Sequence, residues 1–144
     1  MIYCDTSFVA PLVLPEASSD AVEACVKQLP PGEMAVSHWT CVEFASLLAR
    51  RVRLKEVTVR QAILVRREFD RMLEESFEIV VPRAEDFNLA VTWLHTYKSG
   101  LRAGDALHPA IAGNRKAARF LTLDAALIRA AGRLKIPADS GTGW

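Results

Sequence analysis

Apolar residues along the chain follow two alternating patterns. Short apolar runs of strand length occur at MIYC, EMAVS, FEIVVP, ARFLTLD and IPA. The longer segments between them repeat apolar residues every three or four positions, as amphipathic helices do, at about residues 18–29, 40–53, 58–75, 83–100 and 125–135. Strands that alternate with helices of this length predict an α/β fold. We expect a mostly parallel central sheet of about five short strands, flanked by helices on both faces.

Helix boundaries are predicted from capping residues. Thr40 and Glu43 match a capping box, which places a helix start at Thr40 and Glu43 in the first turn. Thr58 and Gln61 repeat this pattern at the start of the next helix. Both helices carry apolar residues on one side, so we expect them to pack against the sheet or each other.

Composition indicates a single domain over residues 1–144. The chain has 51% hydrophobic and 24% charged residues, and no Gly/Ser-rich linker divides it. Its apolar stretches are interrupted well before the ~20 residues of a membrane span, and the apolar N-terminus contains Asp5 and lacks a basic start. The three cysteines have no zinc-site spacing. We therefore expect a cytoplasmic protein without a membrane segment.

Basic residues are concentrated between positions 50 and 71. This stretch has eight Lys or Arg and three Asp or Glu, a net charge of +5, which leaves −4 for the remainder of a chain whose total is +1. Such a surface can bind a phosphate backbone, although a solvated pair of helices explains it as well. The candidates for contact with such a backbone are Arg50, Arg51 and Arg53, about 15 Å along their helix from Glu43, and Arg102, which precedes Asp105 by three residues.

Four carboxylates occupy positions where ligands bind in α/β proteins. Asp5 follows the strand MIYC, and Asp124 follows the strand RFLTL. If these strands are neighbours, both acids lie at the same edge of the sheet, beyond the carboxyl ends of the strands. Glu43 and Asp105 are predicted at helix N-termini, where the helix dipole favours a negative charge, so helix capping alone could explain either residue.

These four acids in one cleft would repel one another unless a cation neutralised them. A set of oxygen ligands without Cys or His favours Mg²⁺ or Mn²⁺, and such a site typically hydrolyses phosphodiester bonds with a metal-activated water. Three hydroxyl residues, Thr6, Ser7 and Thr122, stand beside Asp5 and Asp124. They could support the metal site, or serve only as helix caps.

Four segments, IYCDTSFVAPLV, SHWTCVEFASLLAR, GDALHPAIA and FLTLDAAL, resemble those of PIN-domain ribonucleases, specifically the VapC-type toxins of toxin–antitoxin pairs. The resemblance covers nearly the whole chain. It implies a metal-dependent endoribonuclease, a homodimer and a VapB-type antitoxin that blocks the cleft. It also implies that the metal-binding, catalytic acids are Asp5, Glu43, Asp105 and Asp124, with Ser7 and Thr122 as supporting hydroxyls.

Two residues depart from the family pattern. Gly104 stands where a larger residue is usual, and Pro109 stands where a helix-compatible residue is usual. A helix that begins at Asp105 would be kinked by Pro109, whereas one that begins at His108 would accept Pro109 as its first residue. We predict the kinked helix, which keeps Asp105 and His108 on one face. His108 itself is predicted to be a packed or hydrogen-bonded structural residue rather than a phosphate ligand.

Two other functions fit parts of the sequence. A non-catalytic RNA- or protein-binding module could use the same fold, although the presence of all four acids argues against it. A phosphatase could use Asp5 as a nucleophile, but that chemistry usually has a second acid at the position of Ser7.

Overall fold

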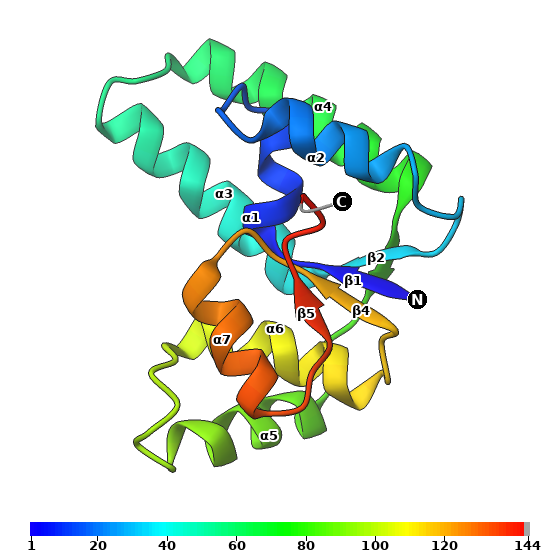
Figure 1. The fold of residues 1–144 in the computed structure, drawn as a ribbon. Helices are drawn as coiled ribbons and strands as arrows, with labels where there is room; N and C mark the ends of the chain where they lie inside the picture. The colour runs from blue at the N-terminus through cyan, green and yellow to red at the C-terminus, as the bar shows by residue number, and fades with distance from the viewer. Residues whose placement is uncertain (143–144) are drawn as a thin grey trace.

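A computed structural model describes residues 1–142, and the last two residues of the predicted domain lie outside this range. Five parallel strands form one sheet in the order β3-β2-β1-β4-β5 (Figure 1). This confirms the predicted sheet. The strands are β1 (Ile2–Cys4), β2 (Met34–Ser37), β3 (Glu78–Val80), β4 (Arg119–Leu121) and β5 (Ala138–Asp139). The last strand begins two residues later than the predicted IPA.

Helices cover both faces of the sheet, as predicted (Figure 1). One face carries α1 (Thr6–Val9), the 3₁₀ helix η1 (Ala10–Leu12), α2 (Ser19–Val26), α3 (His38–Arg53) and α4 (Val59–Ser76). The other carries α5 (Ala84–Leu94), α6 (Ala103–Asn114) and α7 (Ala125–Arg133). No helix among residues 1–142 has the length and hydrophobicity to cross a membrane.

The hydrophobic core has two layers, one on each face of the sheet, because side chains alternate between the faces along each strand. Cys4 and Leu121 pack with α1–α4, whereas Tyr3 and Phe120, the preceding residue in each strand, pack with α6 and α7. Because successive strand residues point to opposite faces, a strand buried on both sides must be apolar throughout. The short apolar runs of the sequence are therefore central strands of a sheet covered twice.

Helix α3 begins earlier than predicted. Its N-cap is Ser37, the last residue of β2, and the strand passes directly into the helix. Thr40 is the third helical residue, and the backbone N–H of Ser37 donates to its hydroxyl at 3.4 Å. The predicted capping box of Thr40 and Glu43 is therefore wrong, and Glu43 lies in the second turn. By contrast, the box of Thr58 and Gln61 is confirmed, with reciprocal bonds of 2.8 and 3.1 Å.

Helix α6 is almost completely buried and contains Pro109 in its interior. The helix begins at Ala103, after the N-cap Arg102. The alternative start at His108 is therefore wrong, and the predicted start at Asp105 is two residues late. Pro109 has no N–H, so it cannot donate to the carbonyl of Asp105 as a residue at this position normally would. The kink stays a prediction.

Candidate active site

A cleft of about 280 Å³ opens at the C-terminal edge of the sheet, where β1 and β4 end. It brings together all four predicted acids and both hydroxyl residues that follow β1. Its walls are Asp5, Thr6, Ser7, Glu43, Leu47, Asp105, His108, Asp124 and Leu127. The strand and helix positions therefore converge as the sequence predicted, although 119 positions separate Asp5 from Asp124.

Asp5 is the most buried of the four acids, with 4% of its surface exposed. It is the N-cap of α1, and its Oδ1 accepts from Ser7 Oγ at 2.7 Å and from the backbone N–H of Phe8 at 3.0 Å. Burial raises the pKa of Asp5, while the charge of His108 and the hydroxyl hydrogen bonds oppose that rise. A nearby cation would favour its ionised form.

The predicted hydroxyl residues join the two halves of the cleft. Ser7 Oγ lies 3.2 Å from Thr122 Oγ1 and accepts from the backbone N–H of Leu123 at 2.9 Å. Thr122 Oγ1 accepts from the backbone N–H of Asp124 at 3.2 Å. These contacts fix the loop that carries Asp124 against the loop that carries Asp5.

Glu43 and His108 form the closest charged contact in the cleft. Glu43 Oε2 accepts from His108 Nε2 at 2.6 Å and from the hydroxyl of Thr6. Burial alone would raise the pKa of Glu43, but the hydrogen bond and charge of His108 outweigh it, so the pKa lies below its usual value. His108 is buried and hydrogen-bonded, as expected for a structural residue. Sequence reasoning missed that its partner is one of the four acids.

Helix capping was considered for Glu43 and Asp105, but the acids that cap helices in the structure are Asp5 and Asp124. Asp124 is exposed and is the N-cap of α7, where its Oδ1 accepts from Ala126 N at 2.7 Å and Leu127 N at 3.1 Å. Asp5 caps α1 in the same manner. Glu43, in the second turn of α3, is not a capping residue, so that explanation is wrong for it. Asp105 lies in the first turn of α6, as expected.

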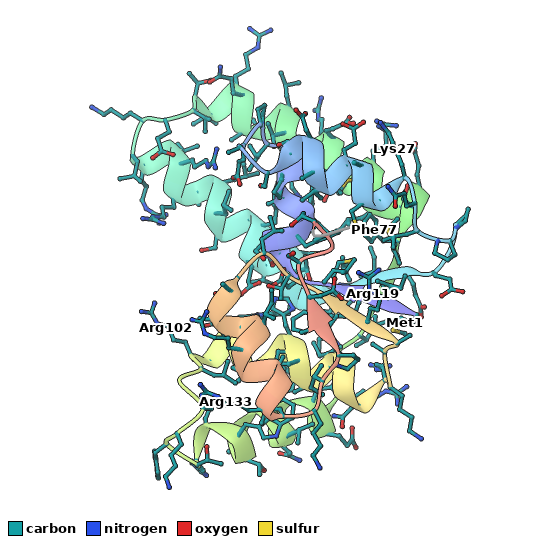
Figure 2. The ribbon with its side chains drawn as sticks, in the orientation of Figure 1. Met1, Lys27, Phe77, Arg102, Arg119 and Arg133 are labelled. Carbon is teal, nitrogen blue, oxygen red and sulfur yellow. The ribbon has the colours of Figure 1, made fainter. Side chains whose placement is uncertain are left out.

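The four arginines predicted to contact RNA lie outside the cleft walls. Arg102 is exposed at the N-terminal end of α6, three residues before Asp105 (Figure 2). Arg50, Arg51 and Arg53 lie in the last turn of α3. Arg51 is held by Glu16 at 2.8 Å, whereas Arg50 and Arg53 are exposed.

Gly104 is tightly enclosed beside Glu43. A Cβ at this position would lie 2.9 Å from Glu43 Oε1 and 3.4 Å from Trp39 Cζ2. The indole N–H of Trp39 is buried beside the Glu43 carboxylate and helps to lower the pKa of Glu43. The absence of a side chain at position 104 therefore leaves room for the Glu43 carboxylate, which explains one of the two departures from the family pattern.

The donor chemistry of the cleft suits a hard metal ion. Carboxylate and hydroxyl oxygens are the ligands that Mg²⁺ and Mn²⁺ prefer. In the part of the chain that the structure describes, no three His, Cys, Asp or Glu side chains are close enough to hold one ion as they stand. Mg²⁺ usually binds through only one or two carboxylates and keeps several of its waters.

The cleft and its sheet place the chain in a known class of proteins. The family profile described as PIN domain matches residues 2–133. The chain therefore belongs to the PIN-domain family, as the resemblance of its four segments implied.

Solved structures share this fold at low sequence identity. FitAcB from Neisseria gonorrhoeae has a TM-score of 0.74 at 17% identity over 100% of both chains. VapBC-1 from nontypeable Haemophilus influenzae has a TM-score of 0.70 at 18% identity over 99% of each chain. VapC20 from Mycobacterium tuberculosis, described as a Sarcin-Ricin loop cleaving toxin, has a TM-score of 0.69 at 18% identity over 90% of this chain and 95% of that one. Curated protein sequences gave no match.

Proposed function

We propose that the protein is a metal-dependent endoribonuclease that acts as the toxin of a toxin–antitoxin pair. The observation that carries this proposal is the convergence of four carboxylates in one cleft at the C-terminal edge of a PIN-domain sheet. Asp5, Glu43, Asp105 and Asp124 would hold Mg²⁺ or Mn²⁺. Bound there, the ion would supply a water of lowered pKa and would stabilise charge on the phosphate.

The pKa shifts and hydrogen bonds of the cleft residues indicate a different role for each at this site. Glu43, whose pKa is lowered, stays ionised at neutral pH and would therefore offer a negative charge to a cation in the cleft. Asp5 is buried and has a raised pKa, so its ionised form depends most on a neighbouring cation. Ser7 and Thr122 keep the two acid-bearing loops together.

Positive charge beside the cleft supports RNA as the substrate. Arg102 is near enough in sequence to Asp105 to reach a phosphate at the cleft, and Arg50, Arg51 and Arg53 extend a basic surface along α3. Arginines at such positions attract and orient a phosphate backbone without selecting its sequence.

The relatives support an antitoxin as a protein partner. Several similar structures are toxin–antitoxin complexes, including VapBC-1 and a complex from Klebsiella pneumoniae. The chain also has an apolar groove between α3 and α4, walled by Leu48, Val52, Val59 and Ile63 and edged by arginines. We propose that a VapB-type antitoxin binds the chain and blocks the cleft, and that the chain is a homodimer.

Cleavage of RNA tests the proposed chemistry directly. The wild type should cleave RNA with Mg²⁺ or Mn²⁺, and a chelator should abolish the reaction. Asp5→Asn and Asp105→Asn should each lower the rate by at least about 10²-fold, because each removes a negative charge from the metal site. Asp20→Asn, an exposed acid on α2, is the matched control and should retain full activity. Activity that survives both cleft substitutions would show that these acids are not the active site.

A non-catalytic binding module remains the second candidate, because the carboxylates do not form a ready metal cluster within the described residues. On that reading the chain binds RNA or a protein without any divalent cation. Titration with Mn²⁺ separates the two: saturable binding that Asp5→Asn weakens supports the nuclease, and no binding at millimolar Mn²⁺ supports the module.

A further inference from the structure

His108 connects the protein core to the cleft through both nitrogens of its ring. The side chain is 3% exposed, with Nε2 2.6 Å from Glu43 Oε2 and Nδ1 2.9 Å from the hydroxyl of Tyr3. An ionised carboxylate only accepts hydrogen bonds, so Nε2 must carry the proton of the contact with Glu43. The hydroxyl of Tyr3 donates its one proton to Ser37 Oγ, so its oxygen can accept from Nδ1 while Nε2 donates to Glu43.

Tyr3 fixes the far side of this ring. It is fully buried in β1, and its hydroxyl donates to Ser37 Oγ at 2.9 Å, at the end of β2. Burial raises the pKa of Tyr3 well above its usual value, and the hydrogen bond of Ser37 only partly opposes this, so the phenol keeps its proton. The ring of His108, carried by α6, is thus held by two central strands.

The two oxygens of Glu43 have different surroundings. Oε2 accepts from His108 and from Thr6. Oε1 lies toward Gly104, where the missing side chain leaves space for it. The hydrogen bonds from His108 and Thr6 both fall on Oε2, so this oxygen is held from the protein side, as in carboxylates that bind a metal ion and are oriented from behind.

We propose that His108 is a positioning residue for Glu43. By donating to Oε2 it orients the carboxylate in the cleft, where a metal ion would bind. This inference rests on the proposed function, because it assigns the cation to the same cleft. Hydrogen bonds that orient metal ligands in this way typically contribute about 10–100-fold to metal affinity.

Two substitutions separate this contact from the burial of the ring. In His108→Gln, the side-chain amide can reach the position of Nε2 and donate to Glu43. In His108→Asn, the shorter amide overlaps Nδ1 and reaches only Tyr3. Both remove the buried ring, so a purely structural role predicts similar losses in the two variants. The readout is the Mn²⁺ dissociation constant of the full chain, from calorimetry and from electron paramagnetic resonance of free Mn²⁺, with melting temperatures recorded in parallel.

We expect His108→Asn to weaken Mn²⁺ binding by about 10–100-fold and His108→Gln to retain most of the affinity. In a Glu43→Gln background, His108→Asn should cause little further loss, because the two residues act through one carboxylate. Equal affinities in the two His108 variants, or a full loss in the Glu43→Gln background, would overturn the proposal.

The same measurements separate this proposal from the ribonuclease itself. If the wild type binds Mn²⁺ in a manner that depends on His108 but cleaves no RNA, the positioning role stands and the ribonuclease proposal fails. If the wild type cleaves RNA and the Asn variant binds Mn²⁺ normally, only the positioning role fails. If the wild type binds no Mn²⁺, both fail.

Discussion

Asp5 shows at the scale of one residue how a functional charge opposes stability. A carboxyl group with a raised pKa in the folded state stabilises the fold in its protonated form. That contribution is fully present below the unfolded pKa, about 3.9, and is lost as the pH rises through the higher folded value. Ionising Asp5 at a pH above that value therefore costs the fold some stability.

Asp5→Asn should relieve this cost. Asparagine can cap α1 as well as aspartate does, so the substitution removes the charge with little change in hydrogen bonding. Without metal, we expect the melting temperature at neutral pH to rise by a few degrees. The difference from wild type should shrink as the pH falls through the raised pKa of Asp5 and be gone below about 4. Thermal unfolding at both pH values measures this, with Asp20→Asn as control. A variant less stable than wild type at neutral pH would contradict it.

Gly104 offers a second test at the same scale. Gly104→Ala and Gly132→Ala each replace glycine within a helix, which alone should stabilise the protein by about 0.5–1 kcal/mol. A Cβ at Gly132 meets nothing within 4 Å, whereas one at Gly104 would press on Glu43 Oε1. We expect Gly132→Ala to be more stable with unchanged Mn²⁺ affinity, and Gly104→Ala to bind Mn²⁺ more weakly. Equal Mn²⁺ affinities would show that Glu43 moves aside freely.

Residue positions were only partly predictable from the sequence. Each acid could be proposed because it follows an apolar run or opens a helical pattern. The contact between Glu43 and His108 could not be predicted from the sequence. The two residues are 65 positions apart, and they meet only when the fold brings α3 and α6 together. Gly104 could be noted as unusual from the sequence, but the reason for a glycine there is the close approach of the α3 side chains Glu43 and Trp39.

At the scale of the element, helix α6 shows how tertiary packing overrides local preference. Proline in the interior of an isolated helix is about 3 kcal/mol less favourable than alanine, which is why the start of α6 was ambiguous from sequence. Pro109 is nevertheless buried within a helix that begins at Ala103. The start of α3 was missed for a related reason, because Ser37 both ends β2 and caps the helix, so no loop separates them.

Pro109→Ala should therefore stabilise the protein. The new N–H can donate to the Asp105 carbonyl, and the lost contacts of the buried ring offset part of the gain, so we expect a net increase on the order of 1 kcal/mol in the free energy of unfolding. Urea denaturation measures it. Pro31→Ala, in an exposed turn, is the matched control and should lower stability slightly by giving the unfolded chain more freedom. A loss of stability in Pro109→Ala would mean that ring packing dominates.

At the scale of the whole molecule, acidic and basic regions are separated along α3. Glu43 lies in the cleft, and the three arginines at the end of the helix lie about 15 Å away along its axis. Long basic side chains project from the α3 and α4 end of the molecule (Figure 2). The alternation of strands and helices along the chain and the charge separation were both accessible from the sequence. The order of strands in the sheet and the apolar groove between α3 and α4 were not, because they depend on how the elements pack.

Arg50→Ala combined with Arg53→Ala should weaken RNA binding without changing the metal site. Removing two cations should reduce the affinity several-fold at low salt and lower the slope of log affinity against log salt by about 1. The affinity for Mn²⁺ should not change. Fluorescence anisotropy with a labelled RNA at several salt concentrations measures this. Lys27→Ala, at the C-cap of α2 and paired with Glu23, is the control. Unchanged RNA affinity in the double variant would exclude this surface as the binding site.

The central place of β1 also affects when the protein can become active during synthesis. Ile2 pairs with Arg119, so the first strand acquires its second neighbour only after Arg119 has been made. Asp124 follows later still. A chain emerging from the ribosome therefore carries Asp5 and Glu43 long before the cleft can close around them. On the proposed function, we expect the nascent chain to stay inactive until the segment with Asp124 has emerged, which leaves time for an inhibitor to bind.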